Sequence, residues 1–237
     1  MNKRRLMEPR ERLIFALDVP TRERALELVD LLADHVGCFK IGLELFVASG
    51  PELVREVVRR APVFLDLKLH DIPATVGRAA AVAGRLGARY LTVHADEGGR
   101  AVEAAIQAAP ETGILCVTVL TSVSEDELRS TGYELGVKEL ARRRAAQARE
   151  RGCRGVICSG QEAAELRKVL GPGPLVVTPG IRPLDSSDAA DQRRVVTPAL
   201  AIERGADLIV VGRPIRDAAD PAAAADRIVR ELASAVA

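Results

Sequence analysis

Short apolar runs recur along the chain, and each is followed by a stretch whose apolar residues are spaced as on one face of a helix. The runs are rich in β-branched and large apolar side chains, which is typical of strands buried on both faces. Eight of them can be counted: Leu13–Asp18, Val36–Ile41, Val63–Lys68, Tyr90–His94, Ile114–Leu120, Gly155–Ser159, Leu175–Thr178 and Leu208–Gly212. Successive runs begin about 28 residues apart on average, the size of one strand–helix unit.

The stretches between the runs predict helices. Residues Thr21–His35 begin with a helix-capping threonine and place Ala25, Leu28, Val29 and Leu32 on one face. Pro51–Ala61 begins with proline, which is favoured in the first turn of a helix. Glycines stand where three of the helices should end, at positions Gly87, Gly152 and Gly205.

Alternating strands and helices imply a parallel sheet, and eight such units imply closure into a barrel. We therefore predict a single-domain α/β protein with the (β/α)8 TIM-barrel fold over residues 12–237, preceded by a flexible tail over residues 1–11. The length of 237 residues agrees with the roughly 250 typical of this fold. An open doubly wound sheet is the alternative, but no G-x-G-x-x-G follows the first run. Two long polar connections, Thr121–Gly136 and Arg182–Thr197, are expected to be loops.

Composition excludes several classes of function. The 34 basic and 33 acidic residues leave a net charge of +1, so the chain lacks the excess of positive charge that is typical of proteins that bind nucleic acid or anionic membranes. The charged N-terminus has no apolar signal-peptide core, and no stretch is apolar enough to span a membrane, so a cytoplasmic protein is expected. Cys116 and Cys158 lie in apolar runs and are expected to be small core residues.

Lysine is scarce, with five residues against 29 arginines. In a chain with so few lysines, a lysine that remains within an apolar stretch is a candidate for a role that needs an amine. Lys40 and Lys68 lie in such stretches, at the ends of the second and third runs.

Polar side chains gather at the ends of the runs. The first ends in Asp18, the second in Lys40, the third in Asp66-x-Lys68 and the fourth in His94. In a barrel of this kind the carboxyl ends of the strands meet on one face, where active sites lie. The polar strand ends therefore predict a functional pocket on that face.

The densest group is Phe64-Leu-Asp66-Leu-Lys68-Leu-His-Asp71-Ile-Pro-Ala-Thr75. A period of two turns Asp66 and Lys68 to the same side, into the barrel. Carboxylates beside an ammonium favour its charged form, which makes it a poor base but a well-placed proton donor to a developing carbanion. The structural alternatives are an internal salt bridge for Asp66–Lys68, a helix N-cap for Asp71, and an ordinary first-turn residue for Thr75.

The segment DLKLHDIPAT, with FALD at Asp18, KIG at Lys40, TPGIRP around Arg182 and VVGRPI around Arg213, resembles the orotidine 5′-phosphate decarboxylases from about Arg12 to near the C-terminus. D-x-K-x-x-D alone is shared with related sugar-phosphate enzymes, and IPAT with the two arginine motifs narrows the resemblance. We expect the monofunctional bacterial type rather than the form fused to a phosphoribosyltransferase half.

The resemblance implies the metal-free decarboxylation of orotidine 5′-monophosphate to uridine 5′-monophosphate, without an organic cofactor. It assigns protonation of the pyrimidine C6 to Lys68, a place beside the substrate carboxylate to Asp66, and contact with the ribose hydroxyls to Lys40 and Asp18. It implies a homodimer with shared sites and a closing phosphate loop. The other implied contacts are across the interface for Asp71, Ile72 and Thr75, with the base for Thr121, and with the 5′-phosphate for Arg182, Gln192, Gly212 and Arg213.

Two other functions stay open. A magnesium-dependent sugar-phosphate lyase of the same superfamily, of the hexulose-phosphate synthase or keto-gulonate-phosphate decarboxylase type, would carry a metal-binding carboxylate where this chain has Lys40. A non-catalytic phosphate-binding barrel is the second. His94 is expected to be a hydrogen-bonded structural residue, and His70 to alternate away from Lys68.

Overall fold

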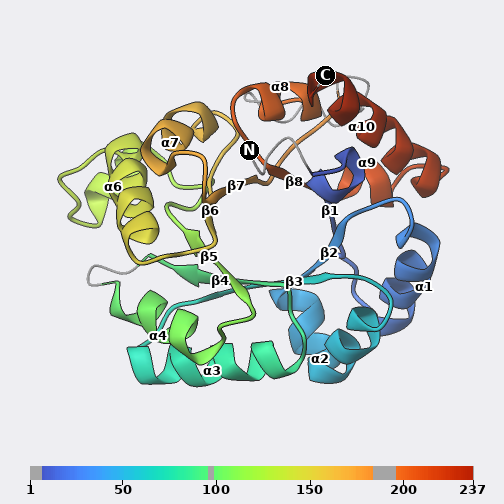
Figure 1. The fold of residues 1–237 in the computed structure, drawn as a ribbon, viewed down its shortest axis with the longest axis horizontal. Helices are drawn as coiled ribbons and strands as arrows, with labels where there is room; N and C mark the ends of the chain where they lie inside the picture. The colour runs from blue at the N-terminus through green and yellow to red at the C-terminus, as the bar shows by residue number, and fades with distance from the viewer. Residues whose placement is uncertain (1–6, 96–98, 184–195, 237) are drawn as a thin grey trace.

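Eight parallel strands close into a barrel in the computed structural model, which describes residues 7–95, 99–183 and 196–236 (Figure 1). Each strand pairs with its neighbours in chain order, and β8 closes the ring against β1 through Leu13–Ile209 and Ile14–Val210. The strands are β1 (Leu13–Ala16), β2 (Cys38–Gly42), β3 (Val63–Leu69), β4 (Tyr90–His94), β5 (Gly113–Val117), β6 (Gly155–Ile157), β7 (Leu175–Thr178) and β8 (Leu208–Val211). The predicted barrel is confirmed.

Helices surround this ring of strands (Figure 1). In the described part of the chain they are α1 (Arg22–Leu32), α2 (Leu43–Val58), α3 (Pro73–Arg85), α4 (Arg100–Ala108), α5 (Glu125–Ser130), α6 (Val137–Glu150), α7 (Ala163–Leu170), α8 (Pro198–Glu203), α9 (Arg213–Arg216) and α10 (Pro221–Val236). A short 3₁₀ helix, η2 (Pro9–Arg12), precedes β1, and residues 1–6 of the expected tail lie outside the described residues.

The alternation of side chains along the strands builds two apolar layers. One set points into the barrel and includes Ile14, Phe64 and Tyr90, with the rings of Phe64 and Tyr90 edge to face at 6.2 Å. The other set points outward and packs beneath the helices, as Phe15 and Phe39 do. Polar residues at the carboxyl ends of the strands therefore lie above a tightly packed, apolar barrel interior.

Local sequence signals account for the helix ends. The Thr21 hydroxyl accepts a hydrogen bond from the backbone N–H of Arg24 and caps α1, as its position predicted. Gly87, Gly152 and Gly205 adopt φ values of 84°, 79° and 98°, the left-handed conformation that glycine permits just after a helix. The predicted helix stops are confirmed at all three.

Several predicted elements differ from the structure by up to three residues at their ends, and two differ more. The connection Thr121–Gly136 is not all loop, because Ser124 and Glu127 form a capping box that starts α5. The helix expected from Pro51 to Ala61 is the second half of α2, which begins at Leu43, kinks at Gly50 (φ 65°) and ends at Val58. Pro51 nonetheless lies where proline is favoured, at the start of the segment after the kink.

Candidate active site

Four charged residues form a row of alternating sign at the carboxyl ends of β1, β2 and β3. Lys40 Nζ lies 3.0 Å from Asp18 Oδ1 and 3.9 Å from Asp66 Oδ2. Lys68 Nζ lies 2.8 Å from the same Asp66 Oδ2. Parallel pairing explains the assembly, since Lys40 is level with Ala16 on β1 and Phe64 on β3. The structure thus brings together the four strand-end charges predicted from the sequence.

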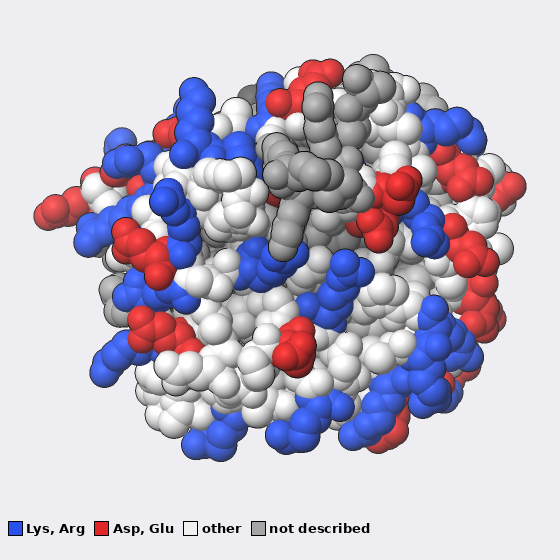
Figure 2. Space-filling model, viewed as in Figure 1, with Lys and Arg blue, Asp and Glu red and all other residues white. Residues whose placement is uncertain are grey.

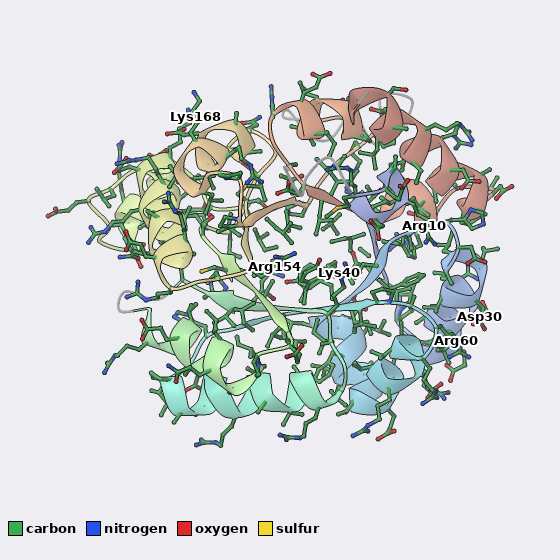
Figure 3. All side chains as sticks on the ribbon, viewed as in Figure 1. Arg10, Asp30, Lys40, Arg60, Arg154 and Lys168 are labelled. Carbon is green, nitrogen blue, oxygen red and sulfur yellow. The ribbon has the colours of Figure 1, made fainter. Side chains whose placement is uncertain are left out.

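The centre of this row is shielded from water. The side chains of Lys40 and Asp66 are 12% and 14% exposed, and Lys68 is 34% exposed. Figure 3 shows Lys40 on the inner side of the ring of strands, whereas the Arg60–Asp30 ion pair lies on the outer edge. Exposed pairs of that kind contribute about 1 kcal/mol or less. A largely shielded carboxylate between two ammonium groups is different, because removing one partner leaves a charge that water compensates poorly.

The β3 backbone is irregular where it carries these groups. Leu65 pairs with Leu91 and Leu69 with Val93, so four residue steps on β3 face two on β4. Lys68 adopts φ 47°, in the left-handed region that costs a residue with a side chain about 1–2 kcal/mol. Such bulges occur next to active sites, where they re-aim a side chain.

Thr92 on β4 was not among the residues singled out from the sequence, yet it contacts both members of the central pair. Its Oγ1 accepts a hydrogen bond from the Lys68 backbone N–H at 2.9 Å and donates one to Asp66 Oδ1 at 3.0 Å. The available signal was period-two alternation, which turns Thr92 inward between Tyr90 and His94.

Two glycines keep space open beside Asp18. A Cβ atom on Gly42 would lie 3.2 Å from Lys40 Nζ, and one on Gly212 would lie 3.5 Å from Asp18 Oδ2. Gly212 also precedes Arg213, the first residue of α9, which places both after β8 as predicted. A Cβ atom at position 42 would crowd the Lys40 ammonium, whereas one at position 212 would make an ordinary contact with Asp18.

Asp71, Ile72 and Thr75 stand apart from this row. Asp71 and Ile72 are exposed, and Asp71 Oδ1 accepts a hydrogen bond from the Ile72 backbone N–H at 2.6 Å. The N-cap of α3 is Ile72, so the N-cap alternative for Asp71 is wrong. Thr75 lies in the first turn of α3, where its Oγ1 is 3.5 Å from the guanidinium of Arg78. Among the described residues of its own chain, Asp71 makes no ion pair with Lys40 or Lys68.

The expected base and phosphate contacts lie after β5, β7 and β8. Thr121 is exposed in the turn that follows β5. Arg182 is buried, and its backbone N–H donates to the carbonyl of Val196 at 3.2 Å, which joins the two described ends of the long connection. Gln192 lies outside the described residues.

His94 and His70 form a ring pair beside the central charges, with centroids 5.3 Å apart. The prediction that His70 alternates away from Lys68 is wrong: the two residues are two positions apart, so a period of two keeps them on the same side, and the His70 ring lies against His94. Burial lowers the pKa of His94, and His70, Arg144 and Lys68 lower it further, so the neutral imidazole is favoured. The structure records a ring contact for His94 rather than the hydrogen bond that was expected.

The remaining features concern cysteines, metals and membranes. All four cysteines are free and buried, which confirms the core interpretation of Cys116 and Cys158. The described residues contain no cluster of three or more potential metal-ligating His, Cys, Asp or Glu side chains. None of the helices in the described ranges is both long and apolar enough to cross a bilayer. Figure 2 shows positive and negative side chains interspersed over one face of the molecule.

Known proteins resemble this chain over nearly its whole length. The model of the orotidine 5′-phosphate decarboxylase / HUMPS family matches residues 11–228. An orotidine 5′-phosphate decarboxylase of Bradyrhizobium sp. strain BTAi1 is 49% identical over 230 residues, covering 97% of this chain and 94% of that protein. Another, of Afipia carboxidovorans, is 50% identical over 230 residues, covering 96% and 97%.

Solved structures agree with these sequence relatives. The orotidine 5′-phosphate decarboxylase of Lactobacillus acidophilus superimposes with a TM-score of 0.84 at 36% identity, covering 93% of this chain and 98% of that one. The enzyme of Pyrococcus horikoshii OT3 gives a TM-score of 0.77 at 27% identity, covering 93% and 99%.

Proposed function

Because the chain belongs to the orotidine 5′-phosphate decarboxylase / HUMPS family, we propose that it converts orotidine 5′-monophosphate to uridine 5′-monophosphate and carbon dioxide, with Lys68 as the proton donor. The enzyme is a carboxy-lyase, and the reaction is a step of de novo pyrimidine biosynthesis. The observation that carries the proposal is the row Asp18–Lys40–Asp66–Lys68 at the carboxyl ends of three adjacent strands.

The chemistry matches this row. The bond from C6 of the pyrimidine to its carboxylate breaks, the electron pair stays on C6, and carbon dioxide leaves. The Lys68 ammonium then transfers a proton to C6 and recovers one from solvent. A fixed positive charge in a partly dry site stabilises the developing carbanion without having to reorganise. In the free enzyme, Asp66 supplies the carboxylate that holds this ammonium at 2.8 Å.

Asp66, Lys40 and Asp18 orient the reacting part of the substrate. Asp66 lies beside the substrate carboxylate, and the repulsion between the two carboxylates is relieved as carbon dioxide departs. Lys40 and Asp18 bind the ribose hydroxyls, while their own 3.0 Å contact keeps both in place. Thr121, in the exposed turn after β5, contacts the pyrimidine base.

The 5′-phosphate binds next to the Asp18 end of the row, where the connections after β7 and β8 meet. Arg182, Gln192, Gly212 and Arg213 hold it, which agrees with the usual phosphate site of such barrels. Closure of the connection between Arg182 and Gln192 over the phosphate uses binding energy remote from C6 to exclude water and complete the site.

The active form is a homodimer in which Asp71, Ile72 and Thr75 reach the partner's site. Exposed apolar side chains support this interface: Ile72 is 65% exposed, and Leu43 and Val47 at the start of α2 are 53% and 80% exposed. Because α2 and α3 both follow the carboxyl ends of their strands, these residues border the same end of the barrel as the charges. An unpaired, exposed Asp71 carboxylate is then available to a neighbouring subunit.

The alternatives are less consistent with the site. For a magnesium-dependent sugar-phosphate lyase, a cation near Asp66 would face the Lys40 ammonium, 3.9 Å from that carboxylate. For a non-catalytic phosphate-binding barrel, the partly buried Asp66–Lys68 pair would carry its desolvation cost without a use. We propose that the reaction needs neither a metal ion nor an organic cofactor, and that the enzyme works in the cytoplasm.

A direct assay tests the proposal. The purified protein is incubated with orotidine 5′-monophosphate in the presence of EDTA, and loss of the substrate is followed by its ultraviolet absorbance. Turnover that EDTA leaves unchanged is expected. An inactive chain would refute the decarboxylase function, and activity that returns only with added magnesium would refute the metal-free chemistry.

A further inference from the structure

We propose that Thr92 is a positioning residue for the decarboxylation: its hydroxyl sets the distance and direction between the Asp66 carboxylate and the Lys68 ammonium. The inference rests on the proposed function, because it assigns to Thr92 an effect on the catalytic step at that same site. Thr92 is fully buried on β4 and has no place in the binding of substrate.

The need for such a residue follows from the bulge in β3. Between the pairs Leu65–Leu91 and Leu69–Val93, the β3 backbone leaves the regular ladder. Within this irregular stretch the Lys68 N–H donates to a side-chain oxygen on β4, and a shielded N–H without an acceptor would be costly. Thr92 lies opposite the bulge, between Leu91 and Val93, and its Oγ1 accepts this N–H at 2.9 Å.

One hydroxyl serves both groups because it can accept and donate at once. While Oγ1 accepts from the Lys68 backbone, its own hydrogen is donated to Asp66 Oδ1 at 3.0 Å. The other carboxylate oxygen, Oδ2, is thereby left facing Lys68 Nζ at 2.8 Å and Lys40 Nζ at 3.9 Å. Thr92 thus fixes the left-handed Lys68 backbone at one end and the carboxylate that holds its ammonium at the other.

The other buried threonines in the described part of the chain bond differently. Thr112 donates to the carbonyl of Ala88, Thr118 donates to that of Ile157, and the Thr178 hydroxyl has no partner. Among these four hydroxyl groups, that of Thr92 is the one with a recorded hydrogen bond to an ionised side chain, the Asp66 carboxylate. Thr112 lies just before β5, at the amino end of the barrel, and is a matched control for loss of a buried threonine hydroxyl.

The experiment compares Thr92→Val, Thr92→Ser and Thr112→Val in steady-state turnover of orotidine 5′-monophosphate and in thermal unfolding. Thr92→Val should lower kcat by about 10- to 100-fold, equivalent to about 1.4–2.7 kcal/mol, and leave KM within about threefold. The phosphate contacts that dominate binding are untouched by this change. Thr92→Ser keeps the hydroxyl and should retain kcat within about threefold of the unsubstituted chain.

Thr112→Val should lower the unfolding temperature with kcat unchanged. If Thr92→Val does not fold, Thr92→Ala replaces it and is compared with Thr92→Ser. The inference is overturned if Thr92→Val keeps full kcat, if KM rises while kcat holds, or if Thr92→Ser loses as much kcat as the variant lacking the hydroxyl. An unsubstituted chain that fails to turn over the substrate would instead refute the proposed function, and with it the step that Thr92 is inferred to support.

Discussion

A dimer in which one chain carries Asp66→Ala and the other Asp71→Ala tests whether two subunits share each active site. Asp66 is held within its own barrel by Lys68, Lys40 and Thr92. The Asp66→Ala substitution therefore damages only the site in the barrel of the chain that carries it. Asp71 is exposed and pairs with neither lysine of its own chain. If it acts on the partner's site, the two substitutions fall on the same site of such a mixed dimer.

The expected magnitude follows from this geometry. In a mixed dimer, the barrel of the Asp71→Ala chain keeps its Asp66 and receives an intact Asp71 from its partner. The other barrel lacks both carboxylates. With two equivalent sites in a symmetric dimer, the mixed species should have about half the kcat of the unsubstituted dimer. Each variant alone should be inactive, because removing one charged member of a desolvated cluster leaves the others uncompensated.

Two different affinity tags on co-expressed chains allow the mixed dimer to be purified through both tags in sequence. Turnover of orotidine 5′-monophosphate is then measured per dimer, and a mixed dimer with two unsubstituted chains serves as the control. If Asp71 acted on its own chain's site, both sites of the mixed species would be damaged. A purified mixed dimer as inactive as its parents would therefore refute the shared site.

Three further predictions follow from the described contacts. Lys68→Ala should abolish turnover, whereas Arg213→Ala should mainly raise KM by about 10- to 100-fold through the lost phosphate contact; equal and mild effects in steady-state kinetics would contradict these roles. The pKa of His94 is lowered in the folded protein, so below about pH 6.5 the unfolded chain binds a proton at His94 more readily than the folded chain does. The free energy of unfolding therefore decreases as the pH is lowered through this range. Urea unfolding at pH 7.5 and 5.5 should show a smaller loss for His94→Gln, and parallel losses would contradict the assignment. Burial raises the pKa of Cys38 to about 12 and also raises that of Cys158. A thiol-specific colorimetric reagent should therefore label the cysteines only after unfolding, because the thiolate is the reactive form. Rapid labelling of the native protein would contradict this prediction.

The barrel was predictable because its signal repeats. Eight buried strands had to be short, apolar and separated by helices, and a parallel sheet can be connected in few other ways. Tyr90–His94 and Leu175–Thr178 were predicted with the bounds that the structure has, since polar or turn residues flank both. Helix α5 was missed because it is only six residues long and its burial is confined to Leu128, too little for an apolar period to show.

The candidate site was predictable where side chains sit at strand ends. Asp18, Lys40, Asp66 and Lys68 stood out because charges in apolar runs are costly, and the structure joins all four. The proposed shared site is harder to predict, since an exposed Asp71 with no cation partner looks the same in one chain whether it contacts solvent or a second subunit. Only the chemistry of a dimer distinguishes these cases.

Thr92 shows why part of the site could not be read from the sequence. The period of two correctly placed Asp66 and Lys68 together, but the backbone between Leu65 and Leu69 does not keep that period. Lys68 reaches Asp66 from a left-handed conformation, and a hydroxyl on the next strand accepts its N–H. A bulge is a relation between two strands, so neither strand alone carries its signal. A threonine on β4 becomes meaningful once the register of β3 against it is known.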